Sequence, residues 1–151
     1  MTGYRQRKRP HYDQIPAELL ELIETGVLAH LSTVNQDGSP QVTVIWLGLD
    51  GDQLVSGHLY RNKKVQNIER DPRVVLSFID TRQNRTFYNP YTVLHARAAV
   101  EPSAGAWDVL NRLATVYLPP GTTFPEARRP GYVVRYSVER IGGVGPWVQN
   151  A

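Results

Sequence analysis

The chain contains no cysteine and a single methionine among its 151 residues. Without thiols it has no disulfide framework, no thiolate nucleophile and no zinc–thiolate site, which fits a reducing compartment. No apolar run approaches the roughly 20 residues that span a bilayer. The basic opening stretch MTGYRQRKRPHY is followed by no apolar segment, so it is not typical of a secretory signal. We therefore expect a cytoplasmic protein without a membrane span.

The common catalytic motifs are missing as well. HExxH, a GxSxG elbow, a phosphate-binding P-loop and a GxGxxG turn after a strand do not occur. No pair of carboxylates stands out as an acid–base dyad. The four histidines show no metal-ligand spacing with one another or with carboxylates; they are His11, His30, His58 and His95. We expect no metal site, and any chemistry would come from a bound cofactor.

Positive charge is concentrated at the start of the chain. Arg5, Arg7, Lys8 and Arg9 fall within the first ten residues, and the remainder has 13 basic against 14 acidic side chains. A nucleic-acid-binding domain usually carries a basic stripe on its folded body, whereas this body is nearly neutral. We expect a disordered basic arm over residues 1–12, a single domain over residues 13–151, and no nucleic-acid partner.

Apolar periodicity and turn signals predict three helices and six strands. Residues 15–26 form an amphipathic helical pattern, because Leu19, Leu22 and Ile23 share one face. Further helices are expected over residues 62–70 and 103–118. Strands are expected over residues 27–34, 40–49, 53–56, 74–80, 91–100 and 132–141.

The connections between the first strands are too short for parallel crossovers. The sequence therefore predicts a mainly β (α+β) fold, a six-stranded antiparallel barrel, closed or partly closed, with peripheral helices. Closure would also remove the exposed strand edges that promote aggregation.

The densest charged stretch of the predicted domain is RNKKVQNIERDPRV, residues 61–74. It lies between two predicted strands and includes the predicted helix 62–70. Such cations can hold nucleic acid, hold a phosphorylated small molecule, or form the solvated face of a helix.

The surrounding residues carry a family resemblance. GVLAHLSTVNQDGSPQVTV is followed by a strand ending VSG and then by the basic stretch. The D-G-x-P turn and the K-x-x-N-[LI]-x-x-D-P-R-V run resemble those of the split β-barrel flavin- and deazaflavin-binding proteins related to pyridoxamine 5′-phosphate oxidase. The ending RIGGVGPW resembles the branch that uses coenzyme F420, a deazaflavin. The resemblance implies the FMN-binding split-barrel fold.

The resemblance also implies a cofactor site. Lys64 matches the family's phosphate-binding lysine, and the start of the helix there offers free N–H groups and a positive dipole end. The other residues implied near the phosphate are Ser56, Gly57, Arg61, Asn62 and Lys63. Gln41, Val42 and Thr43 would run along the flavin or deazaflavin ring.

Four more residues complete the implied site, and for each of the two aromatic residues an alternative stays open. Asn89, Pro90 and Tyr91 fall where the family's partner subunit reaches the cofactor, although Tyr91 could equally be a barrel aromatic. Trp147 could pack over the ring, close the dimer or do neither. Val42 and Val44 could equally be ordinary core residues.

The implied function is that of an F420-dependent oxidoreductase, a reductase that passes a hydride from the reduced deazaflavin to an electrophilic small molecule. The family further implies a homodimer with cofactor sites at the subunit interface. Extra cations favour F420, whose oligoglutamate tail is anionic: Arg61, Lys63, Arg82 and Arg85. Candidate proton donors are His30, Tyr88 and Tyr91.

Three alternatives stay open. FMN shares the ribityl phosphate, so an FMN-dependent oxidoreductase of the same class is one. A non-catalytic F420-binding or carrier protein is another, and a barrel that has lost its cofactor and serves as an interaction module is the third. An oxidase acting on pyridoxamine phosphate is disfavoured, because no second set of phosphate-binding residues is evident.

Overall fold

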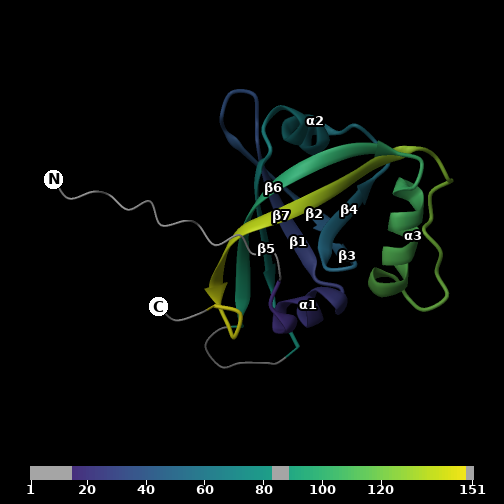
Figure 1. The fold of residues 1–151 in the computed structure, drawn as a ribbon. Helices are drawn as coiled ribbons and strands as arrows, with labels where there is room; N and C mark the ends of the chain where they lie inside the picture. Colours follow the sequence, from purple (N-terminus) through teal and green to yellow (C-terminus); the bar gives the residue numbers. More distant parts are fainter. Residues whose placement is uncertain (1–14, 83–88, 149–151) are drawn as a thin grey trace.

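The computed structural model of the chain describes residues 15–82 and 89–148. Its architecture is mainly β, with one antiparallel sheet and three helices (Figure 1). In chain order the elements are α1 (Ala17–Glu24), β1 (Leu28–Val34), β2 (Pro40–Trp46), β3 (Gly48–Asp50), β4 (Gln53–His58), α2 (Lys63–Arg70), β5 (Arg73–Ile79), β6 (Tyr91–Ser103), α3 (Ala106–Tyr117) and β7 (Gly131–Val144).

The sheet has seven strands in the order β2-β1-β5-β6-β7-β4-β3, so the prediction of six strands is wrong. The difference arises at Leu47, where the predicted strand 40–49 breaks into β2 and β3. The two pieces lie at opposite ends of the strand order. In the described residues β2 pairs only with β1, and β3 only with β4, so hydrogen bonds between strands do not close the barrel.

Tyr117 at the end of α3 stabilises the break. Its hydroxyl accepts from the Leu47 amide at 3.0 Å and lies 2.9 Å from the Leu47 carbonyl oxygen and 2.5 Å from that of Val27. The Tyr117 ring stacks on Trp46 at 5.2 Å between centroids. One side chain thus satisfies backbone groups that the interrupted strand leaves without a ladder partner.

The inner face of the sheet forms the core together with the helices. α1 supplies the three apolar residues of its predicted stripe, and each is at most 1% exposed. α3 lies close against β3, β4 and β7 because glycines face it. A Cβ on Gly48 would stand 2.3 Å from Leu113, and one on Gly57 would stand 3.1 Å from Leu110.

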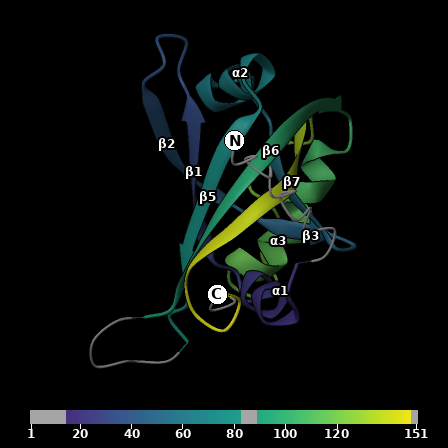
Figure 2. The same cartoon turned by 60° about the vertical axis from the view of Figure 1, so that its left-hand side comes forward.

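The outer face of the sheet is partly apolar. Figure 2 shows β2, β1, β5, β6 and β7 side by side, with α1 and α3 behind them. Large apolar side chains that remain 39–60% exposed lie on these strands: Leu28, Val42, Val44, Ile79, Tyr91 and Val144. The alternative that Val42 and Val44 are core residues is therefore wrong, since they are 60% and 55% exposed.

Replacing Tyr117 with Phe should lower the free energy of unfolding by about 1–3 kcal/mol, the usual cost of leaving buried polar groups without a partner. Urea unfolding of both proteins checks this value. Tyr60→Phe is the matched control, because Tyr60 is 50% exposed, and it should change stability by a few tenths of a kcal/mol at most. Equal effects of the two substitutions would show that the Tyr117 hydroxyl does not hold the break.

Candidate functional site

The start of α2 brings the predicted phosphate-binding residues together. Asn62 is the N-cap, and its side-chain oxygen accepts from the Val65 amide at 3.4 Å. Val65 and Ile68 are buried and hold the helix on the sheet. Lys64 lies on the same face of α2 as Asn67 and Ile68, and its side chain is half-buried. This burial lowers the pKa of its ammonium group.

Asn67, one turn after Lys64, anchors the helix to the β1–β2 hairpin. Its side-chain amide nitrogen lies 3.0 Å from Thr33 Oγ1, 3.0 Å from Asn35 Oδ1 and 3.3 Å from Gln41 Oε1. Arg70 donates to Asn67 Oδ1 at 3.0 Å and to the Val34 carbonyl. Because Asn67 is only 2% exposed, these bonds satisfy an otherwise costly buried amide.

Asn67 is a structural residue that the sequence prediction missed. The available signal was its place in the K-x-x-N run, which puts it on the same side of the helix as Lys64. Its network also occupies the Gln41 side chain, which takes a further bond from Thr33 at 3.1 Å. If Gln41 contacts a ligand, it would therefore do so through its backbone groups.

The end of β4 forms the other side of the site. Ser56 is fully buried, and its hydroxyl lies 2.8 Å from His58 Nε2 and 2.7 Å from the Tyr136 hydroxyl. Burial, and secondarily the charge of Lys64, lower the pKa of His58 to about 3. His58 is thus neutral at pH 7, and Lys64 lies near the end of β4.

β2 and β4 lie beside each other without pairing, which leaves a gap in the hydrogen-bonded sheet, and Lys64 lies near it because its charge acts on His58 at the end of β4. Asn67 fixes the β2 side of this gap, and His58 lies on the β4 side. Thr43 faces inward from β2, and its hydroxyl is buried with no hydrogen-bond partner among the described residues. The gap in pairing between β2 and β4, together with the start of α2, is the candidate site.

Other predicted residues lie away from this gap. Gly57 faces α3, so the close approach that its missing side chain permits is made by a helix. The start of β6, which Asn89 and Pro90 precede and where Tyr91 is the first residue, lies at the opposite end of the sheet from α2 (Figure 1). Trp147 is 4% exposed, belongs to the core and donates from Nε1 to the Tyr91 carbonyl at 3.2 Å.

The cations divide into two groups. Arg61 forms a two-point ion pair with Glu69, with a shortest distance of 2.8 Å, and Arg82 pairs with Asp80 at 2.9 Å and with Glu21 at 3.6 Å. Lys63 and Lys64 have no ion-pair partner among the described residues. Arg85 and Tyr88, predicted as a tail cation and a proton donor, lie outside the described residues.

The donor set suits one phosphate group. The ammonium groups of Lys63 and Lys64 lie in the first turn of α2 without an ion-pair partner in the described ranges, and the amide groups of this turn point out of the helix start. The support for a second, tail-binding set of cations is weaker than expected, because Arg61 and Arg82 already have carboxylate partners.

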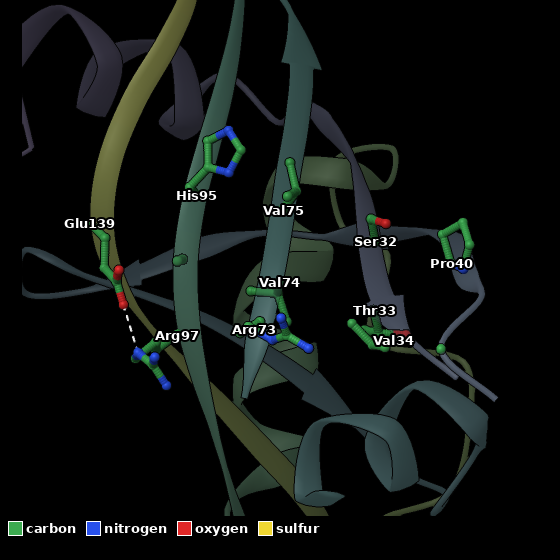
Figure 3. Close-up of a pocket in the computed structure, with 12 residues that line it drawn as sticks. Ser32, Thr33, Val34, Pro40, Arg73, Val74, Val75, His95, Arg97 and Glu139 are labelled. Carbon is green, nitrogen blue, oxygen red and sulfur yellow. Dashed lines mark ion pairs between the residues drawn. The ribbon is translucent and has the colours of Figure 1, made fainter. Parts of the chain in front are cut away.

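A separate cavity of about 430 Å³ lies on the outer face of the sheet, across β1, β5 and β6 (Figure 3). Its charged groups are paired: Arg97 lies 2.7 Å from Glu139, Arg73 lies 2.7 Å from Asp71, and His95 lies 2.9 Å from Arg140. His30 is exposed on the same face, opposite Val44 in the adjoining strand. In the described part of the chain, no cluster of three side chains suited to a metal ion occurs.

The family model for pyridoxamine 5′-phosphate oxidase matches residues 15–143. This chain therefore belongs to the pyridoxamine 5′-phosphate oxidase-like split-barrel family, which includes oxidoreductases. The chain matches no curated protein sequence. None of the helices in the described ranges has the length and apolar content needed to cross a membrane.

Solved structures share the fold. An F420 reductase is 27% identical, with a TM-score of 0.66, over 81% of this chain and 94% of that one. A conserved hypothetical protein from Mycobacterium tuberculosis is 20% identical, with a TM-score of 0.69, over 84% and 82% of the two chains. General stress protein 26 from Bacillus anthracis is 20% identical, with a TM-score of 0.57, over 84% and 94%.

His58 should make the fold sensitive to acid. In the unfolded chain a histidine gains its proton near pH 6.5, whereas folded His58 stays neutral down to about pH 3. Stability should therefore be fully present above pH 6.5 and fall on acidification, by up to about 1.4 kcal/mol per pH unit. His58→Gln should flatten this slope between pH 6.5 and 4 in urea unfolding.

An unaltered slope in His58→Gln would show that His58 is not the buried neutral group responsible.

Proposed function

We propose that the protein is an F420-dependent oxidoreductase that transfers a hydride between a reduced deazaflavin and an electrophilic small molecule. Lys64 carries the proposal: a half-buried ammonium group without an ion-pair partner among the described residues, at a helix start beside an unpaired edge strand. Membership of a family that includes oxidoreductases and the structural similarity to an F420 reductase support it.

In this proposal the residues of α2 and those of β2 bind different parts of the cofactor. Lys64, Lys63 and the first amides of α2 bind the cofactor phosphate. The backbone of residues 41–43 on edge strand β2 orients the ring, because its outward groups have no neighbouring strand. The bound deazaflavin supplies the hydride, and the residues around it contribute orientation and exclusion of water.

FMN is the second candidate cofactor, because it presents the same ribityl phosphate to Lys64. The pairing of Arg61 and Arg82 favours it, since it removes two of the cations expected for an anionic tail. A carrier that binds F420 without turnover would use the same gap. Reduction of substrates by the loaded protein separates the enzyme from the carrier.

We also propose a cytoplasmic homodimer formed through the outer face. Exposed apolar side chains on this face come from five neighbouring strands and are matched in register, as in the pair Ile79 and Tyr91. A twofold partner covers such a patch with its own copy of the patch. The dimer would also bring the partner's Asn89–Tyr91 segment, distant from α2 within one chain, toward the cofactor.

Fluorescence titration of the purified protein with F420 and, separately, with FMN tests the function. We expect F420 to bind at micromolar concentration or tighter and FMN to bind much more weakly. Lys64→Ala should weaken F420 binding by about 1.5–3 kcal/mol, roughly 10- to 150-fold, the scale of a hydrogen bond to a charged group.

Arg73→Gln is the matched control, because it removes one exposed positive charge beyond the other end of α2. It should leave F420 affinity within twofold. Tighter binding of FMN would move the protein to the flavin oxidoreductases. A protein that binds neither cofactor, or a Lys64→Ala variant that binds F420 with wild-type affinity but is less stable, would refute the proposed site.

Ile79→Asp should convert the dimer to a monomer, because a charge at a buried apolar interface costs several kcal/mol. Sedimentation equilibrium measures the mass directly. Val116→Asp is the control, since Val116 is similarly exposed, at 44% against 49%, but lies on α3. A wild-type protein that sediments as a monomer would contradict the proposed assembly.

A further inference from the structure

The outward side chains of five strands form continuous rows across the outer face of the sheet. The strand registers place one such row, in spatial order, at Val42, Ser32, Val75, His95 and Arg140. Val42 belongs to the exposed apolar patch through which we propose that the dimer forms. Figure 3 shows His95 and Val75 on neighbouring strands of this face. His95 therefore lies in the same surface as the proposed interface.

His95 and Arg140 make a hydrogen bond that requires an unprotonated histidine nitrogen. Nε2 of His95 lies 2.9 Å from a terminal nitrogen of Arg140. A guanidinium group has only donors, so Nε2 must be the acceptor and the imidazole ring must be neutral. The pair lies where the register between β6 and β7 shifts, at His95 and Ala96. Protonation of His95 would thus replace this bond with two positive charges at the same place.

The charged groups around His95 do not favour a proton there. Among the described residues, the charged or titratable side chains that share this surface with it belong to the neighbouring strands: Arg140 and Glu139 of β7, Arg97 of β6, Arg73 of β5 and His30 of β1. Glu139 is the one carboxylate in this described group, and it already pairs with Arg97 at 2.7 Å. Burial, and secondarily the charge of Arg140, lower the pKa of His95.

We propose that the His95–Arg140 pair makes the dimer sensitive to acid: subunits associate while His95 is neutral and separate when it gains a proton. This inference rests on the proposed dimer and names the group that controls it. A twofold interface holds two copies of the pair, so protonation adds two charges to one buried surface. Association should be at full strength above about pH 6.5 and weaken as the pH falls, because the exposed histidine of a free subunit gains its proton more readily.

Sedimentation equilibrium at pH 7.5 and at pH 5.0 measures the dissociation constant of the dimer. In the wild-type protein this constant should rise about tenfold or more at the lower pH. His95→Gln should remove most of the rise, because a glutamine carbonyl accepts the hydrogen bond from Arg140 and takes up no proton. His95→Arg should weaken the dimer at both pH values, because its charge is permanent. Near-UV circular dichroism confirms that the subunits are folded at each pH.

Two substitutions on β7 form a matched pair. Arg140→Gln removes the cation beside His95 and should reduce the rise of the dissociation constant at pH 5.0. Arg135→Gln removes a positive charge from the same strand, but Arg135 pairs with Asp50 at 3.0 Å and has Ala99 opposite it on β6. It should leave the rise at the wild-type level.

The outcomes separate this proposal from the proposed dimer. If the wild-type dimer has the same dissociation constant at both pH values, or if His95→Gln shows the full rise, only the role of the histidine is refuted. If the wild-type protein is a monomer at pH 7.5, the dimer and its acid sensitivity fall together.

Discussion

The Asn67 amide is the interaction on which the arrangement of the site depends. It is the buried link between α2 and the β1–β2 hairpin, and it reaches three side-chain oxygens of that hairpin at 3.0–3.3 Å. Buried amides are costly unless they are bonded, so the network permits one seating of the helix. That seating places the Lys64 ammonium group near His58. The geometry of the proposed phosphate site is thus fixed by a residue that need not touch the ligand.

Local sequence patterns were sufficient to predict most of the helices and strands. The helix predicted over residues 62–70 is α2 at Lys63–Arg70, and the helix predicted over residues 15–26 contains α1 at Ala17–Glu24. Each of these helices has an apolar stripe, and residues typical of a helix end lie within a few positions of its boundaries. The family resemblance is confirmed by the match over residues 15–143. The site residues that it implies remain predictions, of which the structure gathers those of α2, β2 and β4 near one gap.

The features that sequence reasoning missed depend on distant parts of the chain. The break at Leu47 needs a hydroxyl from Tyr117, 70 residues later, and the local signal, Gly48, is one that a continuous strand can also contain. The Arg61–Glu69 pair spans the whole of α2, so counting cations overestimated the charge available to a ligand. β2 has polar residues facing inward and valines facing outward, which reverses the usual alternation. The valines therefore resembled core residues.

The break at Leu47 also determines how the gap can change its width. β2 and β3 are separated by one residue, and β3 pairs with the first half of β4 through Gly48 and Val55. β2 and β4 are therefore linked through Leu47, where Tyr117 holds both backbone groups of that residue. We expect any movement of β2 relative to β4 to be restrained at this link and larger away from it.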